Sequence, residues 1–344
     1  MEQTTSRFQP GRRSLLGIAA GLLGAASTRA HAQAAWKPTR PINLIVPWAA
    51  GGSTDSVTRV VASEMEKPLG QTIVIINQAG ASGAIGTNSC LKAARDGYTW
   101  TGGAAQDLGA YQTLGTVPVP ITDWNLYLSI ANVSVLSVNE NSPYKTAAEY
   151  IAGLKAHPGT TSVATAGVTS GGHAAMDMLA KAAGVTYRHV TYDGGTPAVI
   201  ATVSGEADST SQLASEEADM IRAKKLRPLF TFSNQPLELE GFGTIPPLSA
   251  TLPGFTAPMN YFGIFVPKGV PAEVLATLHE VWTTTIAHSE LLRKYSVSHG
   301  ALFAPVDGEA AQKAAFPAVQ ANAWMLFSTG QAKVSPATVG IPAL

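Results

Sequence analysis

Glycine and small hydroxyl residues gather at four places where a short apolar segment gives way to an amphipathic one. Such a junction places the start of a helix at the carboxyl end of a strand, the edge of an α/β sheet where ligands bind. The free N–H groups there, with the positive end of the helix dipole, accept an anion without a charged side chain. Glycine allows the backbone to approach a ligand closely, and Ser or Thr hydroxyls cap the helix or donate to the ligand. We therefore expect the junctions to hold a carboxylate.

Two junctions fall in each half of the predicted fold, and their residues form the candidate ligand-binding set. The candidate residues are Trp48, Ala49, Ala50, Gly51, Gly52, Ser53, Thr54 and Asp55 at the first junction, Gly80, Ala81, Ser82 and Gly83 at the second, Thr169, Ser170, Gly171 and His173 at the third, and Tyr192, Asp193, Gly194, Gly195 and Thr196 at the fourth.

Each junction also has a purely structural interpretation, because any strand-to-helix loop favours glycine for its turn and Ser, Thr or Asp for its cap. Thr196 followed by Pro197 fits an N-cap and a first-turn proline. Asp55 either fixes its own loop by accepting nearby N–H groups or contacts a ligand amine. Trp48 either forms a wall of the pocket or belongs to a core. The repetition of the motif, rather than any single copy, indicates binding.

The elements around these junctions predict an α/β protein with two domains. Apolar strands alternate with amphipathic helices, the first of them expected over residues 56–66 and ended by Pro68 and Gly70. Continuous apolar strands of this kind are typical of mainly parallel sheets flanked by helices. Residues 126–139 and 260–266 are extended without a helix, as expected where a chain crosses between domains. The second domain would then be inserted into the first, with a hinged cleft between them.

The N-terminus predicts an export signal over residues 1–32. Arg12 and Arg13 precede an apolar stretch at residues 15–26, and Ala30-His31-Ala32 forms an A-x-A cleavage site. The stretch is shorter than the roughly 20 residues that span a membrane, so we expect cleavage near Ala32/Gln33 and a periplasmic protein, by either the Sec or the twin-arginine route. The rest of the chain divides into residues 33–132 as the first part of domain 1, 133–260 as domain 2, and 261–344 as a return to domain 1 with C-terminal helices.

Composition and motifs favour a binding protein over an enzyme. The chain has 23 basic and 23 acidic residues, and only 13% of it is charged, so it offers no electrostatic footprint for nucleic acid. Its single cysteine, Cys90, excludes an internal disulfide. The sequence lacks metal-ligand spacings, a nucleophile elbow and nucleotide-binding fingerprints, so we expect no metal or cofactor. His173 is interpreted as a capping or ligand-bonding residue, with a catalytic role in a hydrolase or transferase as the alternative.

Several segments in the right order resemble the substrate-binding proteins of tripartite tricarboxylate transporters, the Bug receptor family. The resemblance is carried by residues 46–59, 77–86, 96–99, 164–173, 192–198 and 261–267. Trp48 stands where many members have Phe, and Gln78 replaces the commoner Arg after the loop asparagine. The loss of that cation argues against a highly charged ligand.

The resemblance implies a two-domain periplasmic receptor of Venus-flytrap form that closes over a small organic carboxylate. In the family, the loops that match residues 49–55 and 192–197 hold the ligand carboxylate, with those matching 80–83 and 169–173 nearby. It also implies membrane subunits of a tripartite tricarboxylate-type transporter as partners, and we expect a monomer that binds no nucleic acid. A receptor of the same fold that docks a sensor protein in signalling is the alternative.

Overall fold

The computed structural model describes residues 1–2, 35–117, 119–233, 235–255 and 257–343. The predicted export signal and its cleavage site fall almost entirely on residues 3–34, outside the described residues. Two sheets organise the chain from Trp36 onward, and a short hairpin, β10 (Leu237–Leu239) with β11 (Gly243–Ile245), accompanies them.

The first sheet has the order β13-β4-β12-β3-β1-β2, and the second has the order β7-β6-β8-β5-β9. The strands of the first sheet are β1 (Ile42–Val46), β2 (Ile73–Asn77), β3 (Thr99–Ala104), β4 (Trp124–Asn132), β12 (Asn260–Pro267) and β13 (Ala301–Asp307). Those of the second are β5 (Ser134–Asn139), β6 (Ser162–Thr165), β7 (Arg188–Thr191), β8 (Ser209–Leu213) and β9 (Leu226–Thr231). We call each sheet with its helices the first lobe and the second lobe.

The α/β class with two sheets is confirmed, but the sheets are mixed rather than mainly parallel. β1 pairs in parallel with β2 and β3, and β6 with β7 and β8. β12 is antiparallel to β3 and β4, and β5 is antiparallel to β8 and β9. The reason is the path of the chain: β4 runs into β5 across the single residue Val133. A strand that enters a sheet directly, without a helical crossover, is free to pair antiparallel.

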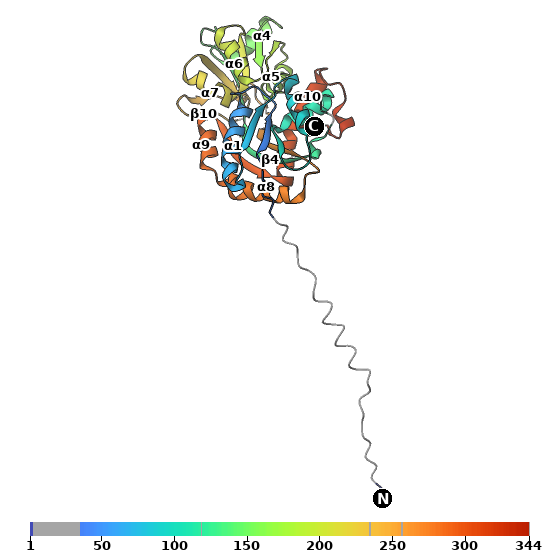
Figure 1. The fold of residues 1–344 in the computed structure, drawn as a ribbon. Coiled ribbons are helices and arrows are strands. Elements are labelled where there is room, and N and C mark those ends of the chain that lie inside the picture. The colour runs from blue at the N-terminus through green and yellow to red at the C-terminus, as the bar shows by residue number, and fades with distance from the viewer. Residues whose placement is uncertain (3–34, 118, 234, 256, 344) are drawn as a thin grey trace. The chain divides into compact units, whose positions relative to one another are not determined.

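Helices cover both faces of each sheet. Along β1, Ile42 and Leu44 pack with α1 and α8 while Ile45 packs with α3 and α10, because alternate side chains of a strand point to opposite faces. The second sheet lies between α4 and α5 on one side and α6 and α7 on the other. Figure 1 shows α4, α5 and α6 around the second sheet and α1 and α8 beside the first. The helices are α1 (Ser53–Leu69), α2 (Ala84–Lys92), α3 (Ala105–Leu114), α4 (Ala147–Ala156), α5 (Gly171–Ala183), α6 (Gly195–Ser204), α7 (Ala214–Arg222), α8 (Ala272–Thr284), α9 (Glu290–Ser298) and α10 (Gly308–Ser328).

The first helix is longer at both ends than the sequence predicts. α1 begins at Ser53 and includes Pro68, and it is capped by Gly70, whose N–H donates to the carbonyl of Glu66. Gly70 has φ +67°, the left-handed conformation that glycine adopts at low cost. The earlier start matters for the site, because it brings the free N–H groups of α1 to the glycines of the first junction.

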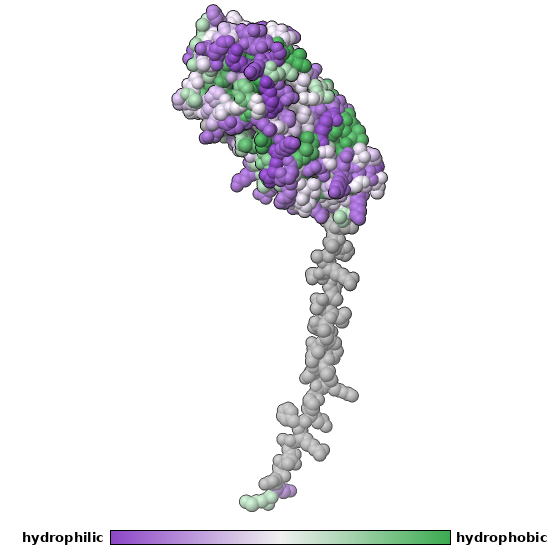
Figure 2. Space-filling view, turned by 90° about the vertical axis from the view of Figure 1, so that its left-hand side faces the viewer, coloured by the Kyte–Doolittle hydropathy of each residue, from purple (hydrophilic) through white to green (hydrophobic). Residues whose placement is uncertain are grey.

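The helices of the described part of the chain fall short of what a membrane span requires. There, every helix is too short or too polar to cross a bilayer. On the face drawn in Figure 2, hydrophobic residues form separate patches among hydrophilic ones.

Candidate ligand-binding site

The first junction is built around Asp55. Its carboxylate accepts the N–H of Gly51 at 2.9 Å, and it binds Arg59 at 3.0 Å and the amide of Asn77 at 3.0 Å. Burial alone would raise the pKa of Asp55, but these hydrogen bonds from Arg59, Gly51 and Asn77 hold the pKa below its usual value. The carboxylate is thus engaged by its own loop, in agreement with the structural alternative for this residue.

The first and fourth junctions contact each other directly across the two lobes. The N–H of Ala49 donates to the carbonyl of Asp193 at 3.2 Å. The hydroxyl of Thr196 donates to the carbonyl of Gly51 at 2.9 Å. These bonds, one in each direction, hold the β1–α1 loop against the start of α6. Tyr192 instead directs its hydroxyl to Glu206, at 2.7 Å.

The second and third junctions also meet. The hydroxyl of Ser82 accepts the N–H of Val168 at 3.2 Å, and the hydroxyl of Thr169 donates to the carbonyl of Ser82 at 3.0 Å. Gly80, Ala81, Ser82 and Gly83 all have positive φ, from 49° to 121°, so this loop turns tightly before α2. Ser170 caps α5 by accepting the N–H of His173 at 3.3 Å. The four junctions thus form two cross-lobe pairs.

His173 lies behind the third junction rather than in the space between the lobes. Its side chain is 1% exposed, and its ring stacks on His189 with centroids 3.9 Å apart. Nδ1 lies 2.8 Å from the carbonyl of Val168, and Nε2 lies 3.3 Å from Asp177. His173 does not line the cavity described next, so this geometry gives no path from its imidazole to a ligand there.

A small cavity of about 30 Å³ lies between the lobes where the junctions meet. That space suffices for one or two water molecules, so the lobes are closed on each other. Seven of the predicted residues line it, namely Trp48, Gly52, Ser53, Thr54, Ser170, Gly171 and Gly195. The other predicted residues, Ala49, Ala50, Gly51, Asp55, Gly80, Ala81, Ser82, Gly83, Thr169, His173, Tyr192, Asp193, Gly194 and Thr196, lie outside its lining.

Two acids that the sequence analysis did not select also line this cavity. Glu216, in the first turn of α7, accepts the N–H of Ser53 at 3.1 Å across the lobes. Asp107, in the first turn of α3, is 3% exposed. Burial raises the pKa of Glu216 to about 7, and hydrogen bonds from Ser53 and Leu213 offset only part of that effect. Burial likewise raises the pKa of Asp107 well above its usual value, against hydrogen bonds from Trp48 and Gln106.

The remaining lining residues are ones that the sequence analysis did not select. They are Ala104, Ala166, Gln212, Leu213, Asn260 and Phe262. Two further strand-to-helix junctions, β3–α3 and β8–α7, were not predicted. The signal of the β8–α7 junction in the sequence is a serine followed by two acids rather than a glycine turn. Among the described residues, no group of three or more His, Cys, Asp and Glu side chains could hold a metal ion.

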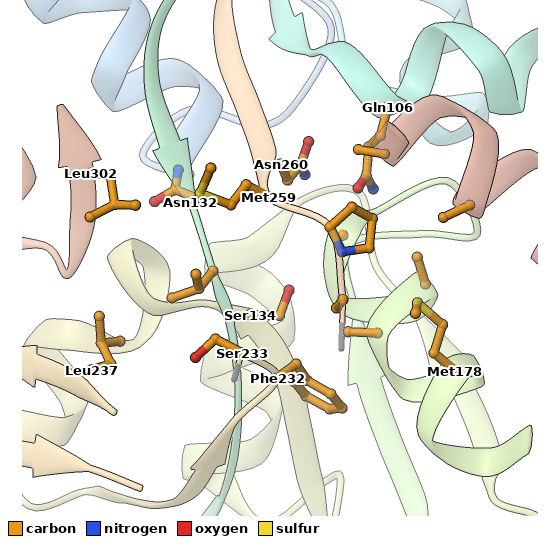
Figure 3. A pocket seen from close by; sticks show the side chains of 18 of the residues that line it. Gln106, Asn132, Ser134, Met178, Phe232, Ser233, Leu237, Met259, Asn260 and Leu302 are labelled. Carbon is orange, nitrogen blue, oxygen red and sulfur yellow. The ribbon is translucent and has the colours of Figure 1, made fainter. Parts of the chain in front are cut away.

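A second, larger cavity of about 250 Å³ adjoins the first and shares Gly171 and Asn260 with it. Figure 3 shows this cavity, with Met178, Phe232 and Met259 on its walls and Asn132 and Asn260 near its upper edge. It lies where the two crossing segments pass between the sheets, because Asn132 ends β4 and Asn260 begins β12. Apolar walls with a polar edge can hold the apolar body of a small molecule.

The chain resembles proteins of one family over most of its length. Residues 57–327 match the family model described as tripartite tricarboxylate transporter family receptor. This match covers well over half of the chain. The chain belongs to the tripartite tricarboxylate transporter receptor family.

One relative and two solved structures are similar to the chain over most of its length. A UPF0065 protein from the gbd 5′ region of Cupriavidus necator is 33% identical over 276 residues, 78% of this chain and 82% of that protein. The periplasmic binding protein BugD has the same fold, with a TM-score of 0.78, 24% identity, and coverage of 86% of this chain and 99% of BugD. MatC from Rhodopseudomonas palustris with bound malate gives a TM-score of 0.73 at 25% identity, covering 86% of this chain and 98% of MatC.

Proposed function

We propose that the chain is an exported solute receptor that takes up a small organic carboxylate between its two lobes and delivers it to the membrane subunits of a tripartite tricarboxylate-type transporter. The observation that carries this proposal is the meeting of two helix starts at one cavity. Gly52 precedes α1 in the first lobe, and Gly195 opens α6 in the second. A Cβ atom on Gly52 would lie 3.8 Å from the backbone nitrogen of Gly195.

Two facing helix starts suit an anion because each contributes free N–H groups and the positive end of its dipole. A carboxylate between Gly52 and Gly195 therefore contacts both lobes at once. Closure is favoured by a ligand only when the closed form binds it better than the open form does. The carboxylate is the group that supplies this difference in affinity. The hydrogen bonds Ala49–Asp193 and Thr196–Gly51 form next to it in the closed form. MatC holds malate, a dicarboxylate, and this supports a carboxylate as the ligand class.

Admission of a ligand requires the lobes to part, because the cavity of about 30 Å³ is smaller than any organic acid. The crossing strands β4–β5 and the start of β12 are the connections about which the lobes can turn. Export through the predicted signal at residues 1–32 would place the receptor in the periplasm.

Thermal unfolding of the purified protein, dialysed from denaturant to remove carried-over ligand, tests the proposal. A panel of small carboxylic acids is compared with the matching amides, which lack the charge. An acid at 100 times its Kd stabilises the fold by about 2.7 kcal/mol, which is visible as a raised Tm. We expect at least one acid to raise the Tm while its full amide does not. A protein that responds to no acid, or equally to acid and amide, would refute carboxylate capture.

Substitution of Gly52 by valine locates the site. The branched side chain would enter the space between Gly52 and Gly195, where Ala49 O and Glu216 Oε1 already lie 3.6 Å from an added Cβ. We expect the fold to persist and the acid-induced rise in Tm to disappear. An undiminished response would remove the α1 start from the site.

A further inference from the structure

Glu216 is held mainly by its own lobe. Oε2 accepts the N–H of Leu213, the residue that precedes α7, at 3.4 Å. In the amide orientation that satisfies both its side-chain atoms, Gln212 donates to the same oxygen at 2.9 Å. Only Oε1 reaches the first lobe, through the N–H of Ser53. When the lobes part, Glu216 therefore stays on the second lobe and turns a free acceptor toward the cleft.

Asp107 and Asn260 supply further polar atoms that lack partners. Asp107 Oδ1 and both side-chain amide atoms of Asn260 have no hydrogen-bond partner among the described residues, although the two side chains are 3% and 4% exposed. Buried polar atoms are costly to leave unpaired. All three residues, Asp107, Glu216 and Asn260, line the same cavity, and its described lining contains no Lys, Arg or His.

We propose that the solute carries, beside its carboxylate, a nitrogen that donates hydrogen bonds, either an amide or a protonated amine, and that Asp107 and Glu216 receive this group. This inference rests on the proposed function and names the ligand class of the same site. Asp107 belongs to the first lobe and Glu216 to the second. An N–H group between them bonds to both lobes and so favours the closed form.

A nitrogen donor also fits the electrostatics of the two acids. A cation at the site would lower the pKa values that burial raises in Glu216 and Asp107.

The test uses unbranched acids that differ only in the terminal group. The four-carbon set is butyrate, succinate, succinamate and 4-aminobutyrate, and the two- to six-carbon homologues cover other spans. Affinities are measured by calorimetry at pH 7. We expect succinamate or 4-aminobutyrate, or a homologue of either, to bind at least about tenfold more tightly than the matching acid with a terminal methyl group.

Glu216→Gln and Asp107→Asn replace each acid by a group of the same shape. In either variant we expect 4-aminobutyrate and succinamate, or the homologues that bind best, to lose about tenfold or more in affinity. Glu206→Gln, an exposed acid of the second lobe outside the cavity lining, is the matched control and should change neither affinity. The two variants are independent, so misfolding of one leaves the other as a test.

The outcomes separate the inference from the proposed function. If acids bind but without preference for the nitrogen-bearing member, or if both variants keep the wild-type preference, the inference is wrong while carboxylate capture stands. If no acid of any length binds, the proposed function itself fails and the inference falls with it.

Discussion

Glu216 Oε1 lies 3.1 Å from the backbone nitrogen of Ser53, so a carboxyl group of the second lobe accepts a hydrogen bond from the start of α1, the helix that follows the first junction. An acid at this position is favourable to the dipole of α1. It is also costly, because burial of the carboxyl group raises its pKa to about 7. This contact therefore links the protonation state of Glu216 to the contact between the lobes.

Folding stability should fall as the pH rises through 7, partly because of Glu216. The pKa of this group is higher in the folded protein than its ordinary value of 4.5, so the folded state binds the proton more tightly than the unfolded state. This contribution is fully present below pH 4.5 and is lost as the pH rises through about 7. Glu216→Gln removes the titration. Denaturant unfolding at pH 5 and pH 8 should show the variant gaining about 3 kcal/mol relative to wild type between the two values. If the difference in unfolding free energy between the variant and the wild type is the same at pH 5 and at pH 8, Glu216 is not buried in its charged form.

Binding of an amine-bearing acid should tighten between pH 6 and pH 8. A cation beside Glu216 lowers its pKa, so binding releases a proton and is favoured as the pH rises. The groups that face Glu216 are Asp107 from α3, Glu217 from α7 and Tyr295 from α9, and these bring no positive charge. Calorimetry in buffers of different ionisation enthalpy measures the proton release. The pH dependence should flatten in Glu216→Gln, and its persistence there would assign the proton to another group.

Two glycines of the site should respond in opposite ways to alanine. A Cβ on Gly195 would lie 2.1 Å from Cδ of Glu216, whereas on Gly52 the nearest atoms are 3.6 Å away. Gly195→Ala must therefore displace the Glu216 carboxyl within the second lobe, and this breaks its hydrogen bond to Ser53 of the first lobe and disfavours the closed form. Gly52→Ala fits the closed form. Small-angle scattering without ligand should show a larger radius of gyration only for Gly195→Ala. Equal radii for the two variants would contradict the closed arrangement around Glu216.

Thr196→Val tests how much the junction contacts favour closure. Valine keeps the shape of threonine but removes the hydroxyl that donates to Gly51 at 2.9 Å. The loss of one hydrogen bond shifts the closed-to-open balance by about 1 kcal/mol. A pair of fluorophores, one on each lobe, should report a larger open fraction and a several-fold weaker ligand affinity. Thr338→Val, in an exposed turn near the C-terminus, is the control substitution.

His173→Ala distinguishes a structural from a catalytic role. The imidazole is buried, stacked on His189 and bonded to Val168, so its removal should cost about 2 kcal/mol of unfolding free energy or more. Ligand affinity of the folded variant should stay within a few-fold of wild type. Turnover of a bound acid by wild type that is lost in this variant would instead support the enzyme alternative.

The local features of the fold could be predicted from the sequence. The four glycine junctions precede the helices α1, α2, α5 and α6, as predicted, because apolar runs, turn glycines and caps act over a few residues. The crossings around residues 126–139 and 260–266 were also visible as extended stretches without a helix. α3 and α7 were not predicted, and each brings one of the two cavity acids, Asp107 and Glu216.

The sequence by itself determined that glycine junctions open helices at strand ends, because that chemistry lies within a few consecutive residues. Only the tertiary structure decided which side chains face the cavity. Asp107, Glu216 and Asn260 come from α3, α7 and β12, and their proximity follows from how the lobes pack rather than from any local period. The antiparallel pairing of β4, β5 and β12 was likewise decided by the path of the chain between sheets. His173 lies outside the cavity lining for the same reason, because its ring stacks on His189 inside the second lobe.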